Sequence, residues 1–108
     1  EIFKFGASLY VVNTLNKKQA IKYDQNLSGA EVINFGANII DACVYGGALQ
    51  VLSESAVYKT DGALAVLLKW GDFGEGPGRV FNGKSIAYNT IDGLLYIQDG
   101  STIKKFGE

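Results

Sequence analysis

The stretch GALQVLSESAVYKTDG occupies residues 47–62, and GLLYIQDGSTIKKFGE occupies residues 93–108. Each begins with the pattern Gly-x-Leu-x-(Val/Ile), in which Leu49 and Leu95 hold the same place, 46 residues apart. Each continues through polar residues into a second short segment with β-branched or aromatic side chains. Such segments on either side of a polar turn are typical of β-hairpins, so we interpret the two stretches as copies of one hairpin.

An earlier part of the chain has its segments in the same order. SLYVV, which contains Leu9, precedes AIKYD, and Leu9 stands 40 residues before Leu49. A period of roughly 40–46 residues with about four strands per unit predicts propeller-like blades. The single repeat segment of residues 1–108 then divides into units of residues 1–36, 37–83 and 84–108, of which the last lacks its fourth strand.

The whole chain is predicted to be all-β. Its short segments are rich in Val, Ile, Tyr and Phe, which suit a pleated sheet, and no segment has a sustained helical period. Asp-Gly pairs at 61–62, 92–93 and 99–100 are typical of tight hairpin turns. The expected strands are IFKFG, SLYVVN, AIKYD, EVINF, IIDACVYG, ALQVLSE, AVYKTD, LAVLLKW, SIAYNTI, LLYIQD and TIKKFG. We expect antiparallel four-stranded repeats, about 2.75 of them, in a propeller-like or open β-sheet assembly.

Two details of composition favour sheets that pack face to face. LAVLLKW and IIDACVYG are almost continuously apolar, which predicts strands buried on both faces. Ala42, Cys43 and Ala87 fall in the first strands of their units, where small side chains fit a crowded axis.

The hairpins SLYVVN…AIKYD and LLYIQDGSTIKKFG resemble those of β-propeller repeat proteins, which have a Leu-Tyr-Val…Ile-x-Lys pattern in each blade. The resemblance implies architecture only, because no Trp-Asp dipeptide or other mark of one propeller family occurs. Propellers have about four to eight blades, so fewer than three units leave the ring open and expose an unpaired edge. The chain is then a piece of a longer protein, one of several copies that complete a ring, or a member of a flat stack.

Composition narrows the classes of function. The 108 residues carry a net charge of −1 and no histidine, so we expect neither a nucleic-acid partner nor a histidine base or metal ligand. No apolar run approaches the roughly 20 residues of a membrane span. Cys43 is the only cysteine and is predicted to be a buried small hydrophobe. We therefore expect no enzymatic activity and no cofactor or metal. Asn26 begins an Asn-Leu-Ser triplet, which permits N-glycosylation but is common by chance and leaves the compartment open. The functions considered below favour an extracellular or virion-associated location.

The segment GRVFNGKS, residues 78–85, matches the spelling of a phosphate-binding loop, G-x-x-x-x-G-K-[ST]. Such a loop needs a helix after it, and IAYNTIDG after Ser85 predicts a strand and a turn instead. We interpret the match as a plain loop with a solvated Lys84, in which Val80 and Phe81 form a short strand or pack against the sheet.

The segment KWGDFGEGPGRVF, residues 69–81, holds the only Trp, Pro and Arg of the chain. Its candidate contacts with a sugar or a protein partner are Trp70, Phe73, Arg79 and Phe81. The alternative is that Trp70 ends a core strand and the glycines allow an irregular connection.

Two functions remain open. The first is a non-enzymatic structural or interaction module, such as a virion tail component, adhesin or extracellular filament, that assembles with further copies or with the rest of a larger protein. The second is a lectin-like carbohydrate-binding module that forms a ring by oligomerisation.

Overall fold

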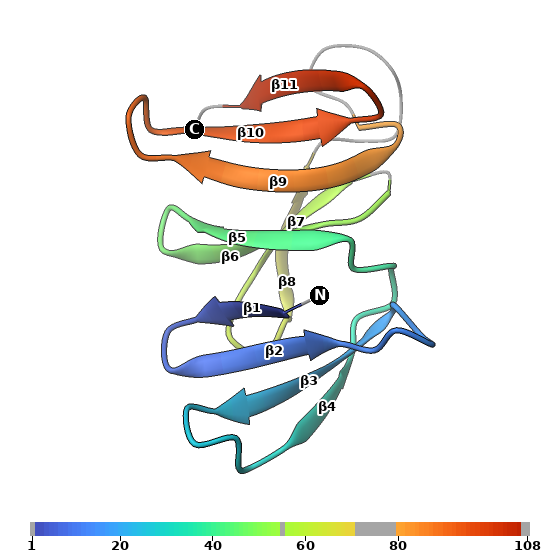
Figure 1. Ribbon diagram of the computed structural model, residues 1–108, viewed down its shortest axis with the longest axis vertical. Helices are drawn as coiled ribbons and strands as arrows, with labels where there is room; N and C mark the ends of the chain where they lie inside the picture. The colour runs from blue at the N-terminus through green and yellow to red at the C-terminus, as the bar shows by residue number, and fades with distance from the viewer. Residues whose placement is uncertain (1, 55, 71–79, 107–108) are drawn as a thin grey trace.

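The computed structural model describes residues 2–54, 56–70 and 80–106, in which every regular element is a β-strand. The strands are β1 (Ile2–Phe5), β2 (Ser8–Val12), β3 (Gln19–Asp24), β4 (Glu31–Asn34), β5 (Asp41–Tyr45), β6 (Ala48–Leu52), β7 (Val57–Thr60), β8 (Val66–Trp70), β9 (Gly83–Asn89), β10 (Leu94–Asp99) and β11 (Thr102–Phe106). They form a first sheet (β1–β4), a middle sheet (β5–β8) and a third sheet (β9–β11), all antiparallel (Figure 1). The prediction of an all-β chain of open antiparallel sheets is confirmed.

Within each sheet the chain runs back and forth, so that consecutive strands are hydrogen-bonded neighbours. Gly93 and Gly100 have positive φ, as the Asp-Gly turns predicted. The Asp61-Gly62 turn differs, because the residue with positive φ is Leu64, at 59°. There the Asp61 carboxylate accepts the backbone N–H groups of Ala63 and Ala65, at 2.9 and 3.0 Å, and so holds the turn.

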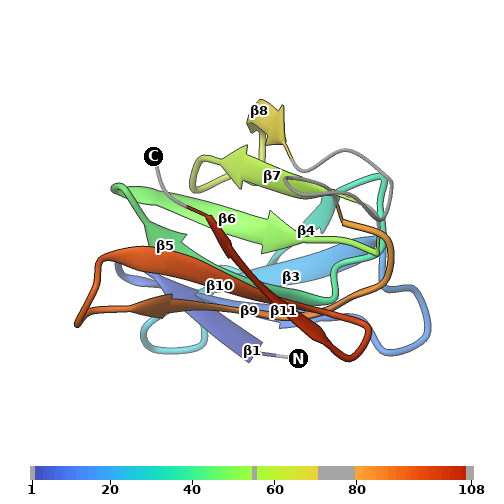
Figure 2. The same ribbon diagram turned by 90° about the horizontal axis from the view of Figure 1, so that it is seen from above.

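The sheets stack face to face without closing into a ring (Figure 1). β5 lies between β1 and β9, and β8 forms the opposite edge of the middle sheet (Figures 1 and 2). The side chains of β6 alternate between two cores. Leu49 and Val51 pack toward the first sheet with Tyr10, and Leu52 packs toward the third sheet with Ile97. All five residues of β6 are buried as a result.

Hydrogen bonds join the sheets where their faces meet. The Tyr10 hydroxyl of the first sheet donates to the backbone carbonyl of Gly62 in the middle sheet, at 2.5 Å. The Asp41 carboxylate of β5 accepts the backbone N–H of Ile86 in β9, at 2.9 Å. Both bonds fix the position of one sheet relative to the next.

Two expectations about burial are wrong for the same reason. LAVLLKW was expected to be buried on both faces, but Val66, Leu67 and Leu68 are each at least half exposed. Ala87 was expected at a crowded axis, yet it is exposed on the outer side of the third sheet. Both segments lie where a further strand or sheet would cover them, and the described residues supply none. β5 is only partly buried, with Ala42 packed against one core and Cys43 against the other.

Gly83 marks the closest approach of two backbones. A Cβ at this position would lie 2.5 Å from the Ser53 carbonyl oxygen and 3.0 Å from the Leu52 side chain. Contact this tight between a backbone and a side-chain atom cannot be relieved without moving β9 away from the middle sheet. Glycine at position 83 is therefore required by packing.

We expect Gly83→Ala to lower the free energy of unfolding by about 1–3 kcal/mol, because the added methyl group overpacks this contact. Gly62→Ala is the matched control, since its Cβ would meet nothing nearer than the Tyr10 hydroxyl at 3.8 Å. That change should stay within about 0.5 kcal/mol. Urea denaturation of both variants measures the difference, and equal stability would contradict the packing account of Gly83.

Candidate functional site

The first sheet presents an apolar face away from the middle sheet. Tyr10 and Val12 of β2 point into the core, so Leu9 and Val11 point outward, as alternation along a strand requires. Cross-strand pairing places the neighbours of these two residues on the same side. The outer face of the first sheet consists of Ile2, Lys4, Leu9, Val11, Ile21, Tyr23 and Val32. Ile2 is 66% exposed and Val32 is 57% exposed.

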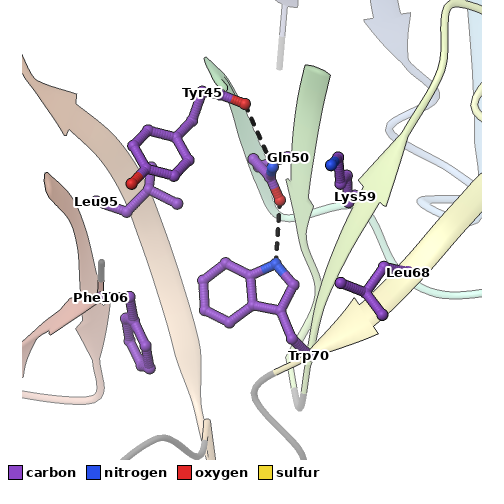
Figure 3. A pocket seen from close by; sticks show the side chains of 7 residues that line it. All are labelled: Tyr45, Gln50, Lys59, Leu68, Trp70, Leu95 and Phe106. Carbon is purple, nitrogen blue, oxygen red and sulfur yellow. Dashed lines mark hydrogen bonds between the residues drawn. The ribbon is translucent and has the colours of Figure 1, made fainter. Parts of the chain in front are cut away.

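A pocket of about 280 Å³ opens between the middle and third sheets (Figure 3). Trp70, at the end of β8, forms one wall, and its ring meets that of Phe106 edge-on with centroids 4.9 Å apart. The Trp70 indole N–H donates to the Gln50 side-chain oxygen at 3.1 Å. The complete lining is Tyr45, Gln50, Lys59, Leu68, Trp70, Leu95 and Phe106.

The pocket follows from the unequal number of strands in the two sheets. Leu68 and Trp70 belong to the fourth strand of the middle sheet, whereas the third sheet ends at β11 among the described residues. In the described part of the chain no strand lies opposite β8, so the gap is open beside Phe106. Its chemistry is aromatic on two sides, with the Gln50 amide and the Lys59 ammonium as polar groups, a combination that suits a small polar ligand with an apolar face.

The structure separates the residues that the sequence had grouped. Trp70 lines the pocket, whereas the exposed Phe81 borders a different hollow together with Asp99 and Lys104. Phe73 and Arg79 lie outside the described residues. The pocket residues that the sequence did not indicate come from distant strands, Tyr45, Gln50 and Phe106 among them. Of these three residues, only Gln50 is distinctive in the sequence, because it is the one polar residue within the apolar run ALQVL.

The segment that spells a phosphate loop binds a carboxylate of its own chain. The backbone N–H groups of Phe81 and Asn82 donate to Asp99, the shortest bond being 2.6 Å from Asn82. Lys104 forms an ion pair with the same carboxylate at 2.6 Å. As predicted, Val80 is buried in the core, Lys84 is exposed, and a strand rather than a helix follows. The loop prediction is wrong for the end of the segment, because β9 already begins at Gly83 and includes Lys84 and Ser85.

Asp99 and Cys43 are two ionisable groups whose pKa is shifted by their surroundings. Burial favours protonated Asp99, but the hydrogen bonds from Lys104 and from the amides of Asn82 and Phe81 outweigh it and lower its pKa. For Cys43, burial and the nearby Asp41 charge raise the pKa to about 12, so the thiol stays protonated at neutral pH. Cys43 was predicted to be buried, and the structure places it partly buried against the core between the middle and third sheets.

Other kinds of site are not formed by the described residues. In residues 2–54, 56–70 and 80–106, no group of three or more Cys, Asp or Glu side chains is arranged to hold a metal ion. Nor does this part of the chain contain a helix of the length and apolar character needed to cross a membrane.

We expect Asp99 to make the free energy of unfolding fall as the pH becomes acidic. Its pKa is lower in the folded chain than in the unfolded chain, so the unfolded chain binds the proton more readily. The stabilisation is therefore complete above the ordinary carboxyl pKa of about 4 and is lost as the pH falls toward the folded value. Asp99→Asn should cost about 1–3 kcal/mol at neutral pH and should reduce the further loss in acid, as measured by urea denaturation between about pH 3 and 7. Equal acid sensitivity in both proteins would contradict this role.

Comparison of the chain with protein-family models, with curated proteins and with solved structures finds no match. Its function is therefore argued from two features of its own surface. One is the outer face of the first sheet, and the other is the pocket beside Trp70.

Proposed function

We propose that the chain is a non-enzymatic structural module that assembles with further copies of itself, or with the remainder of a larger protein. The observation that carries this proposal is the outer face of the first sheet. Six of its seven side chains are apolar or aromatic, and they come from all four strands. A contiguous apolar surface of this kind is typical of an interaction site, since monomeric proteins seldom leave one in water.

The edges of the sheets support the same proposal. β8 presents Val66, Leu67 and Leu68, and the outer edge of a sheet offers unpaired backbone groups to another chain. Among the described residues, β11 ends a sheet one strand shorter than the other two. This part of the chain therefore leaves both apolar surface and backbone hydrogen-bonding groups without cover.

The stacking of the sheets favours a propeller-like assembly. β1, β5 and β9 are the first strands of their sheets and lie side by side, as the inner strands of propeller blades do (Figure 1). Three sheets fall short of the about four to eight blades of a closed propeller, so further sheets from other copies would complete the ring. A virion tail component, a surface adhesin or an extracellular filament would use such a module.

We expect the chain to form oligomers at micromolar concentration, because association removes the outer face of the first sheet from water. Light scattering should give a mass of at least twice the 11.6 kDa of one chain. Val32→Glu places a charge on this face and should weaken association, whereas Lys84→Glu, at an exposed position on β9, should not. A wild-type chain that remains a stable monomer would refute self-assembly.

A second candidate function, carbohydrate binding, is favoured by the pocket beside Trp70. Aromatic rings stack on the apolar faces of sugars, and amide and ammonium groups donate to their hydroxyls. Trp70, Phe106 and Tyr45 supply the rings, while Gln50 and Lys59 supply the donors (Figure 3). Of the candidates expected from the sequence, which were Trp70, Phe73, Arg79 and Phe81, only Trp70 is among the residues that support this alternative.

If this pocket binds glycans, wild-type protein on a glycan array should give selective signals. Lys59→Ala should reduce them while the protein keeps its melting temperature, because Lys59 is only partly buried. Lys69→Ala, on the neighbouring strand but outside the pocket lining, is the control and should bind as wild type does. Absence of wild-type signals, or equal binding by all three proteins, would remove the carbohydrate proposal.

A further inference from the structure

In each sheet, two equivalent residues of the second strand point toward the side on which the preceding sheet would lie. The equivalent pairs are Leu9 and Val11 in β2, Leu49 and Val51 in β6, and Leu95 and Ile97 in β10, as their cross-strand partners show. Leu49 and Val51 are buried against the first sheet, and Leu95 and Ile97 are buried against the middle sheet. Leu9 and Val11 hold this position in the first sheet, where none of the described residues cover them. The outer face of the first sheet is thus equivalent to two faces already buried in the molecule.

The turn between the third and fourth strands repeats this relation. Leu27 and Leu64 both have positive φ, 61° and 59°, a conformation that costs a leucine about 1–3 kcal/mol. Asp24 holds the first turn by accepting two backbone N–H groups, as Asp61 holds the second. Leu64 is 4% exposed and packs in the core against the first sheet, whereas Leu27 is 66% exposed. The first sheet therefore has the same leucine in the same strained turn, but without a sheet to pack against.

The outer side of the third sheet corresponds to the side of the first sheet that covers Leu49, Val51 and Leu64 of the middle sheet. Tyr96 and Lys105 are cross-strand partners in the third sheet, as Tyr10 and Lys22 are in the first. In both pairs the ammonium lies over the ring, 5.7 and 6.0 Å from its centroid. Tyr10 and Lys22 pack toward the turn of the middle sheet, where the Lys22 ammonium lies 3.9 Å from the position that a Gly62 Cβ would take.

We propose that the outer face of the first sheet in one copy packs against the outer face of the third sheet in a second copy. Leu9, Val11 and Leu27 of one copy would meet Tyr96 and Lys105 of the other, as Leu49, Val51 and Leu64 pack with Tyr10 within one chain, where Lys22 lies over the Tyr10 ring near Gly62. This inference rests on the proposed self-assembly and specifies which two surfaces meet.

Charge favours the same pairing. Within one chain, the Lys22 ammonium lies beside the turn that begins at Asp61. In the first sheet, Asp24 occupies the position equivalent to Asp61. Lys105 of the second copy would therefore approach the exposed carboxylate of Asp24. The Tyr96 hydroxyl donates to Asp92 of its own chain, so recognition depends on the tyrosine ring and on Lys105.

A contact between two different faces either closes a ring or continues as a filament. The described residues of one chain form three sheets, so two copies give six, which lies within the about four to eight blades of closed propellers. Three copies would exceed that range. A closed dimer with two identical contacts is therefore the expected product.

The first test uses Leu27→Asn. Asparagine adopts positive φ more readily than leucine, so the isolated chain should keep or raise its melting temperature. The dissociation constant of the dimer should rise by about tenfold or more. Leu64→Asn is the matched control in the equivalent turn, and it should lose stability because Leu64 is buried. On the third sheet, Tyr96→Ala and the exposed Ile103→Glu are two independent variants that should also weaken the dimer.

The second test mixes the two kinds of variant. Chains that carry Leu27→Asn and Val32→Glu retain an intact third sheet, and chains that carry Tyr96→Ala and Ile103→Glu retain an intact first sheet. Each kind alone should be monomeric by light scattering, and an equimolar mixture should recover a dimer through the one remaining contact. Third-sheet variants that still dimerise as wild type does, or a mixture that stays monomeric, would overturn the head-to-tail contact while self-assembly stands. A monomeric wild type would overturn both.

Discussion

The whole arrangement depends on a middle sheet that must be covered on both sides. Every residue of β6 is buried, with Leu49 and Val51 in one core and Leu52 in the other. A strand with apolar side chains on both faces is stable only between two layers, because either face in water would lose its hydrophobic stabilisation. The first and third sheets supply these layers. Each of them then has one covered and one uncovered face, and that asymmetry produces the surface on which the proposed function rests.

Much of the fold is readable from the sequence because strand periodicity and turn residues are local properties. The offset between Leu49 and Leu95 predicted equivalent strands, and the two leucines do hold equivalent places in β6 and β10. Burial is different, since it depends on how many sheets surround a segment. LAVLLKW reads as a core strand, yet β8 is an exposed edge because nothing described in the third sheet lies opposite it. The pattern of residues within one segment does not show whether another strand lies beside it.

The pocket was less predictable than the fold for a related reason. Trp70 stood out by its composition, but its partners Tyr45, Gln50 and Phe106 lie between 20 and 36 positions away in the sequence and meet only through the stacking of two sheets. The match to the phosphate-loop motif is the opposite case, in which a short local pattern suggests a function that its structural context does not support. Gly83 is explained by its close approach to Ser53, and the amides of Phe81 and Asn82 bind Asp99. Among the described residues of this motif, Phe81, Asn82 and Gly83 thus serve contacts within the chain.

The repeated direction of the Leu-x-Val pairs has a consequence for how such a chain can change its length during evolution. In both contacts between the described sheets, the Leu-x-Val or Leu-x-Ile pair of one sheet packs against the sheet before it. Duplication or deletion of a stretch encoding one complete unit would therefore bring surfaces of the same two kinds together again. Gene rearrangement can therefore alter the number of sheets in a single step, while point mutation is left to diversify the loops and the outermost strands.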